Sequence, residues 1–485
     1  ALAGAVLVAA PLSGLATVRF SSTSASLCIR MQASLLVLVV GLSSPLFAQK
    51  EAGYGRSYVI EADAAWISPG EVVAPAFLSI QDGIVERVSR QQPRGGGPTL
   101  LGLGGGGAKV LKVQGTLAPG LVDAWSGLTP SAIGSSRNQP IWAVVSDGLP
   151  LDIEGSAPSL SANVLAARTA GVAAVFLGNP ASQLRRGSGT PALFSSRHLP
   201  RPEGFVALEF ALGSARDMGV SGFLQGDELA EVFQEAVDWR DSLDEHAEKV
   251  EKYEKDLKAY QKKLDEFVKE QKKASEDAAG AAQSGESGGG PKEEGEKAAA
   301  MPKRPKRPKA PASRTARDQI LEAINGDSQV RVYADTVADI RAALALGTKH
   351  HLDLVVVGAF EADIVAEELA EAGIPIVLSV FEWGVGDRSL IERWNRLQSA
   401  KVEVALSSGG VPNGHAGLLL RAGELIAAGA DVDEVWAALT TVPARLLGLS
   451  KRAGRLVDGA TASVILFEGS SPFDASATFR SHIPK

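Results

Sequence analysis

Short apolar stretches alternate with amphipathic stretches over two long parts of the chain, residues 118–235 and 315–450. The apolar stretches have the length and β-branched composition of buried strands, and the amphipathic ones fit helices. Strands are predicted at 171–177, 330–333, 354–357, 374–378 and 402–406, and helices at 336–346 and 362–372. This alternation is typical of a parallel sheet covered by helices. The length favours an α/β fold of the (β/α)8 TIM-like barrel type, with a doubly wound sheet as the alternative.

A different pattern precedes and follows the barrel. Residues 55–117 hold short alternating segments separated by glycine-rich turns, and residues 463–468 return to the same pattern. Such spacing indicates a small antiparallel sheet or sandwich. We therefore expect a discontinuous β-sandwich domain from 56–117 plus 452–485, and a barrel from 118–237 plus 313–451. The glycine run 102–107 lacks the Lys-Ser/Thr ending of a phosphate loop and is interpreted as a flexible turn.

Residues 238–312 interrupt the strand–helix pattern. Apolar residues recur every seven positions within a charged sequence, as two interleaved sets: Leu243, Val250, Leu257 and Leu264, and Tyr253, Tyr260 and Phe267. This stripe predicts a coiled-coil helix, with His246 at its seam. Residues 275–300 have the composition of a disordered segment, and 302–311 that of an extended linker. An intramolecular helical hairpin and pairing between chains both remain open for this insert.

The beginning of the chain has the features of a processing segment. An apolar run at 33–42 follows Met31, and small residues precede position 49. This pattern predicts a leader over residues 1–48, cleaved near Ala48, and a periplasmic or secreted protein. Residues 1–30 would lie upstream of the true start or extend the leader. No later apolar run is long enough for a membrane span.

Charge and cysteine content exclude some classes of protein. The net charge of −7 argues against a dedicated nucleic-acid binder, so the basic run at 302–311 is not interpreted as a nucleic-acid site. Cys28 is the sole cysteine, which excludes a disulfide scaffold and a cysteine zinc site. The chain has only six histidines, and none are spaced i, i+2.

Three separated motifs resemble those of one enzyme superfamily. Residues 116–127, TLAPGLVDAWSG, resemble the first barrel strand of the amidohydrolase superfamily, Pro-Gly-apolar-apolar-Asp-x-His-x-His. Residues 438–449 followed by 454–459 resemble its closing helix and β return. Residues 170–189 resemble the imidazolonepropionase-like branch. The resemblance implies a barrel that holds one or two divalent metals such as Zn at its C-terminal mouth, with an Asp on the last strand as general base.

This chain departs from the motif at the positions that ligate metal. The His-x-His pair falls on Trp125 and Gly127, and the fifth-strand His falls on Tyr333. The sixth-strand His falls near Val357, and the last-strand Asp falls on Ser408 or Gly409. We therefore expect no metal cofactor in this copy.

Four other residues are weaker pocket candidates: Asp123, Asp335, Ser408 and His415. Asp123 is expected to brace the first strand, and Asp335 to open a helix. His415 follows a strand in a Gly/Pro/Asn loop and is interpreted either as a ligand contact or as an exposed loop residue. Ser408 has no His at recognisable spacing, so a Ser-His-Asp triad has little support.

Three hypotheses for function follow. The first is a metal-free, catalytically impaired amidohydrolase homologue with a binding or assembly role, pairing with a second copy or an active relative through the heptad helix. The second is an active hydrolase of non-peptide carbon–nitrogen bonds, such as cyclic amides, that uses Asp123, Tyr333, Asp335 and His415. The third is a coiled-coil interaction protein in which the insert is the main functional element.

Overall fold

A computed structural model of the chain describes residues 57–92, 109–128, 162–178, 184–194, 201–202, 206–213, 222–283, 301–311, 315–381, 390–411, 414–473 and 479–483. The predicted leader, the glycine run 102–107 and residues 284–300 of the predicted disordered segment lie outside these ranges. Within them, no helix has the length and apolar character that crossing a bilayer requires.

The largest sheet forms the predicted barrel. Its strands lie in the order β16-β15-β14-β13-β12-β10-β9-β8. Their bounds are β8 (Leu121–Asp123), β9 (Val172–Leu177), β10 (Arg185–Leu193), β12 (Ala207–Ala211), β13 (Val330–Ala334), β14 (Leu354–Gly358), β15 (Ile376–Ser379) and β16 (Val404–Ser407). A short strand, β11 (Arg201–Pro202), pairs with β10. The prediction of a TIM-like α/β barrel is confirmed.

One strand departs from the all-parallel arrangement. β10 runs antiparallel to both β9 and β12, whereas β12 to β16 pair in parallel. The connection from β9 to β10 spans residues 178–184. This is far shorter than the dozen or more residues of a parallel crossover, so the chain turns back instead.

Helices cover the outside of the barrel, and alternate strand residues fill its inside. The covering elements are α3 (Ala162–Thr169), α5 (Thr315–Ile324), α6 (Val337–His350), η4 (Ala362–Val365), α7 (Ala366–Ala372), α8 (Leu390–Ser399), η5 (Gly414–Gly417), α9 (Leu418–Ala427), α10 (Val432–Leu439) and α11 (Thr441–Leu446). The inner core includes Phe176, Tyr333, Val357, Val377 and Ala405. The barrel interior is therefore a packed core rather than a pore.

Two small sheets are formed by segments that precede and follow the barrel in the sequence. One has the order β5-β4-β1-β6 and the other β18-β17-β7-β2-β3. Their bounds are β1 (Ser57–Ala62), β2 (Ala64–Ser68), β3 (Glu71–Val73), β4 (Ala76–Gln81), β5 (Ile84–Ser89), β6 (Lys109–Lys112), β7 (Thr116–Pro119), β17 (Val464–Phe467) and β18 (Phe479–Ile483). β17 pairs antiparallel with β7, so a C-terminal strand completes an N-terminal sheet.

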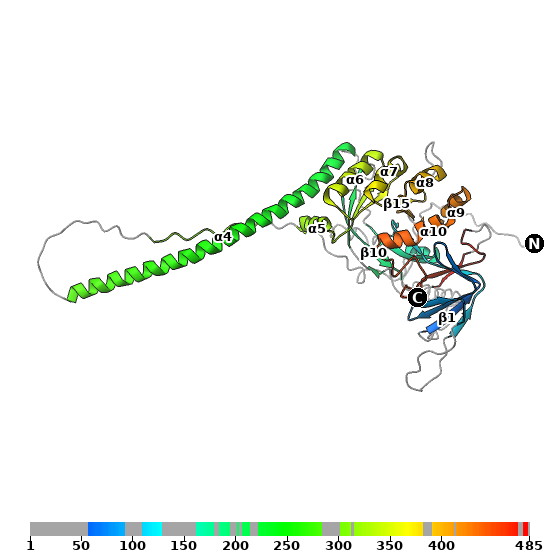
Figure 1. The fold of residues 1–485 in the computed structure, drawn as a ribbon, viewed down its shortest axis with the longest axis horizontal. Helices are drawn as coiled ribbons and strands as arrows, with labels where there is room; N and C mark the ends of the chain where they lie inside the picture. The colour runs from blue at the N-terminus through cyan, green and yellow to red at the C-terminus, as the bar shows by residue number, and fades with distance from the viewer. Residues whose placement is uncertain are drawn as a thin grey trace, which may run out of the picture. The chain divides into compact units, whose positions relative to one another are not determined.

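The insert contains a single long helix, α4 (Gly222–Gln283), drawn in green in Figure 1. The expectation of disorder from residue 275 onward is wrong for 275–283, because α4 continues through them. These residues are rich in alanine, the strongest helix former, and they extend a helix that is already nucleated. The first part of α4 packs on the barrel through Leu229, Phe233 and Trp239, which are buried.

Candidate functional site

Two of the metal-ligand positions of the motif hold aromatic rings that pack against each other. Trp125 follows β8 and Tyr333 lies in β13, and their ring centroids are 5.6 Å apart at an interplanar angle of 74°. The Tyr333 hydroxyl donates a hydrogen bond of 2.6 Å to Oε1 of Glu209, in β12. Tyr333 is buried, so this bond is shielded from water. The aromatic pair thus occupies the end of the barrel where the resemblance places a metal.

The two glycines at motif positions have no room for a side chain. A Cβ on Gly127 would lie 2.7 Å from the backbone oxygen of Val411 and 2.9 Å from that of Gly410. Gly409 has a φ of +64°, and a Cβ there would overlap Oγ of Ser379. A real Cβ rarely approaches other atoms so closely, since interiors are packed to crystal density. The backbone after β16 therefore fills the space that the second His would need, and Ser379 of β15 fills the space beside Gly409.

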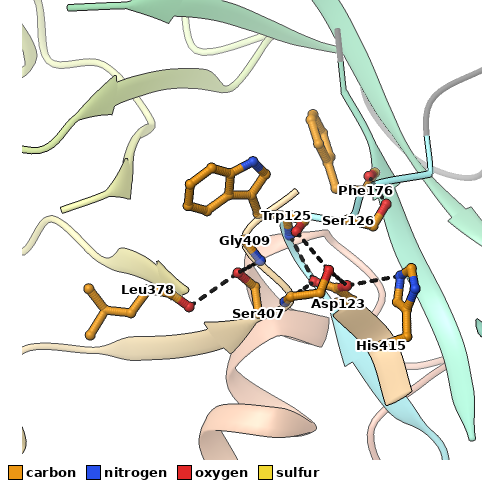
Figure 2. Close-up of polar contacts among 9 residues, drawn as sticks. Asp123, Trp125, Ser126, Phe176, Leu378, Ser407, Gly409 and His415 are labelled. Carbon is orange, nitrogen blue, oxygen red and sulfur yellow. Dashed lines mark hydrogen bonds and ion pairs between the residues drawn. The ribbon is translucent and has the colours of Figure 1, made fainter. Parts of the chain in front are cut away.

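Asp123 joins the first barrel strand to the segment after the last one. Its Oδ2 accepts a hydrogen bond of 2.5 Å from the Ser408 hydroxyl, and its Oδ1 accepts bonds of 3.2 Å from the backbone N–H groups of Ser408 and Trp125. Nε2 of His415 lies 3.1 Å from Oδ2. Figure 2 shows these contacts converging on Asp123. The carboxylate closes the barrel, in agreement with the predicted bracing role.

Burial and partners act on Asp123 in opposite directions. Complete burial acts to raise its pKa, because an ionised carboxylate loses hydration. The imidazole of His415 close to Oδ2 and the hydrogen bonds from Ser408 outweigh this, and they hold the pKa of Asp123 below its usual value. Asp123 is therefore ionised in the folded chain at neutral pH.

The structure corrects the interpretation of His415. It is not an exposed loop residue, since it is 3% exposed. It lies in η5, whose glycines pack closely: a Cβ on Gly417 would lie 2.7 Å from the ring of Phe381. Neither ring nitrogen of His415 has a hydrogen bond of good geometry, although Nε2 is within ion-pair distance of Asp123. The sequence could not show this burial because Phe381 and Asp123 are distant in the chain.

The Asp123 cluster does not have the order of a catalytic triad. In a Ser-His-Asp triad the imidazole lies between the hydroxyl and the carboxylate and takes the proton. Here the carboxylate lies between, in contact with both Ser408 and His415. Such an arrangement makes the hydroxyl a donor to the carboxylate and places no imidazole base beside it. Asp335, the fourth candidate, lies at the end of β13 beside Gly358 of β14.

Sequence analysis missed two charged residues of the barrel interior. Glu209 is 1% exposed, and Arg331, in β13, is 0% exposed. The Arg331 guanidinium lies 3.9 Å from the ring centroid of Phe176 and donates to the backbone oxygen of Ala124. The available signal was a charged residue within an otherwise apolar strand, because such strands are buried on both faces.

The donors gathered at the mouth do not fit the family's metal. An indole N–H only donates, glycine has no side chain, and the Tyr333 hydroxyl is bonded to Glu209. Among the described residues, no group of three or more His, Cys, Asp or Glu side chains could hold an ion. His198 lies outside the described residues. His350 and His351 lie at the C-terminal end of α6.

Comparison with models of protein families gave no match, and comparison with curated protein sequences gave none. Solved structures do match. An amidohydrolase from Thermotoga maritima MSB8 has a TM-score of 0.56 at 17% identity, over 88% of this chain and 98% of that one. A prolidase complexed with N-methylphosphonate-L-proline has a TM-score of 0.45 at 15% identity, over 88% and 100%. A beta-aspartyl dipeptidase from Fervidobacterium islandicum AW-1 has 0.42 at 12%, over 89% and 98%.

Of these three, the Thermotoga structure has the TM-score that supports a shared architecture. Its identity is low, so the likeness concerns the fold and not the chemistry of the site. The barrel, the accompanying small sheets and the nearly complete coverage of that enzyme agree with the three sequence motifs. The fold that the resemblance implies is thus confirmed: the chain shares its fold with the Thermotoga amidohydrolase.

Proposed function

We propose that this chain is a metal-free, catalytically impaired homologue of the amidohydrolases that serves a binding or assembly role. One observation carries the proposal: four of the motif positions that would supply a metal ligand hold either a packed ring, at Trp125 and Tyr333, or a glycine with no space for a side chain, at Gly127 and Gly409. Trp125 and Tyr333 stack edge to face, and the backbone of Gly410 and Val411 abuts Gly127.

The close packing around the motif positions is stronger evidence against a metal site than the loss of single ligands. A metal site needs donors aimed at one point and an open position for water. At Gly127 even the first atom of a side chain would meet the backbone oxygen of Val411 at 2.7 Å. Restoring a histidine there would require the segment after β16 to move. The packing at Gly127 therefore argues against a metal cage, which supports the proposal.

The test is metal content and turnover of the purified full chain. The protein is dialysed against Zn²⁺, Mn²⁺ or Fe²⁺, washed, and analysed by elemental mass spectrometry, and hydrolysis of cyclic amides and dipeptides is followed in parallel. We expect well below one metal per chain and no turnover above buffer. Stoichiometric metal together with turnover would overturn the proposal.

If turnover is seen, two variants test the alternative function, an active hydrolase that uses the Asp123 cluster. Asp123→Asn and His415→Gln alter the buried cluster, whereas Glu367→Gln alters an exposed residue of α7 and is the matched control. Activity that disappears in the first two and persists in the control would establish the second hypothesis, an active hydrolase of carbon–nitrogen bonds with an unusual site.

A further inference from the structure

The outer part of α4 carries a stripe of half-buried residues. We call it the α4 stripe; its members are His246, Val250, Tyr253, Leu257, Tyr260, Leu264 and Phe267, and the other residues from 247 to 276 are exposed. Beside the stripe, Leu243 is 39% exposed and Val268 is 57% exposed. A helix in open solvent leaves apolar side chains as exposed as these two. A covering element is therefore needed along the length of the stripe.

Residues 301–311 show burial with a different period. Pro302, Pro305, Pro308 and Pro311 are half-buried, and every residue among them is exposed, as is Met301. The segment forms neither helix nor strand. A polyproline II helix has three residues per turn, so prolines spaced by three lie on one face. The burial pattern shows that this proline face, and not the Lys and Arg between, is covered.

The beginning of the α4 stripe and the end of residues 301–311 both adjoin the contact between α4 and α5. Just before the stripe, Nε1 of Trp239 donates to Asp318 of α5 at 3.4 Å, and Arg317 pairs with Glu235 at 3.4 Å. Residues 301–311 precede α5 in the chain, so Pro311 enters beside the beginning of the α4 stripe. The chain from Pro302 to Pro311 then runs antiparallel to α4, back toward the barrel.

The α4 stripe and the proline segment are similar in length and in repeat distance. The stripe from 246 to 267 spans about 32 Å at 1.5 Å per residue. The segment from 302 to 311 spans about 28 Å at 3.1 Å per residue. One heptad advances about 10.5 Å and one polyproline turn about 9.3 Å, so the mismatch is close to 1 Å per repeat. Proline rings spaced in this way fit between successive aromatic and leucine side chains, as PxxP segments fit aromatic-lined grooves.

We propose that the α4 stripe is a polyproline-binding face, and that residues 301–311 of the same chain occupy it. The insert is then a self-paired arm of one α-helix and one polyproline II helix. The stripe is not available for a coiled coil with a second copy. This proposal is independent of the proposed function of the barrel, because it concerns contacts within the insert alone.

Hydrogen exchange of the full chain tests the pairing. The test variant replaces Pro302, Pro305, Pro308 and Pro311 with Ser, and the matched control replaces Lys303, Lys306 and Lys309, which are exposed, with Ser. We expect amides at 250–267 to exchange at least tenfold faster in the proline variant and at the parental rate in the control. Barrel amides should be unchanged in both. Equal exchange at 250–267 in the two variants would overturn the proposal.

Spin labels separate pairing within the chain from pairing between chains. With Cys28 replaced by Ser, a label at Glu266→Cys alone reports a second copy, and labels at Glu266→Cys and Lys303→Cys report the arm. We expect no dipolar coupling from the single label and a distance of about 10–20 Å from the pair, since both sites lie near the outer end of the two helices. Coupling in the singly labelled protein, or no short distance in the doubly labelled one, would contradict the proposal.

Discussion

At the scale of single residues, the barrel mouth is defined by which side chains are absent as much as by which are present. Gly127 and Gly409 have no space for a side chain, because the backbone after β16 lies against Gly127 and Ser379 lies against Gly409. Asp123 has the opposite character: it is a buried charge that gathers donors from three parts of the chain. Buried charges persist only where they are paired and hydrogen-bonded.

A methyl group at Gly127 should strain the mouth. Gly127→Ala would place Cβ 2.7 Å from the backbone oxygen of Val411, so we expect a loss of about 1–3 kcal/mol in the free energy of unfolding. The matched control is Gly423→Ala in α9, where a Cβ meets nothing within 4 Å. Urea unfolding measures both. A control loss as large as that of Gly127→Ala would refute the packing argument.

Removing the Asp123 charge should weaken barrel closure. Asp123→Asn keeps the shape but loses the anion that accepts from Ser408 and faces His415, so we expect about 2–4 kcal/mol of destabilisation at pH 7. Glu367→Gln, at an exposed carboxylate, is the control and should have little effect. Chemical unfolding with tryptophan fluorescence compares the two.

The same residue predicts a pH dependence. Because the pKa of Asp123 is lower in the folded chain, its stabilising contribution is complete above the unfolded value of about 3.9 and is lost as pH falls toward the folded value. Stability of the parent should therefore fall below about pH 4 more steeply than that of Asp123→Asn. Unfolding curves at pH 5.0, 4.0 and 3.5 test this. Parallel curves for the two proteins would show that Asp123 does not contribute.

At the scale of elements, α4 has two parts with different partners. Up to Trp239 one face of α4 is buried against the barrel helices, whereas beyond residue 240 none of the described residues of α4 is fully buried. The heptad pattern predicted the helix and its stripe, since spacing along a helix is a local property. It did not reveal the proline face, because half-burial at 302–311 depends on another segment.

Removing the arm should leave the barrel intact. Replacing residues 244–313 with a short Gly/Ser linker keeps the Trp239–Asp318 bond and the contacts of α5. We expect the free energy of unfolding to change by no more than about 1 kcal/mol, because none of the removed residues whose burial the structure describes is fully buried. Loss of cooperative unfolding in the shortened chain would show instead that the arm supports the barrel.

At the scale of the whole chain from residue 57 onward, the sheet that contains β2, β7 and β17 shares a core cluster with the barrel. Trp66 of β2 packs edge to face on Trp436 of α10, with centroids 5.7 Å apart, and donates to the backbone oxygen of Ser470 at 2.9 Å. Ile465 of β17 belongs to the same cluster. Parts that share a core unfold together, so the β sheets are expected to melt with the barrel.

Truncation of Trp66 should lower the stability of both parts at once. For Trp66→Ala we expect about 3–5 kcal/mol of destabilisation and a single calorimetric transition. Trp66 is only 8% exposed, so the loss is a core cavity. Two resolved transitions, with the barrel transition unmoved, would contradict a shared core.

The sequence by itself determined the elements and their order. Strand and helix periods, the heptad stripe and the three superfamily motifs are local patterns, and they led to the barrel and its relatives. Tertiary structure alone decided the rest. Asp123 meets Ser408 across 285 positions, and Gly127 meets Val411 across the same gap between the first and last strands. Local periods carry no record of such contacts, because which backbone fills which space depends on how the closed barrel packs.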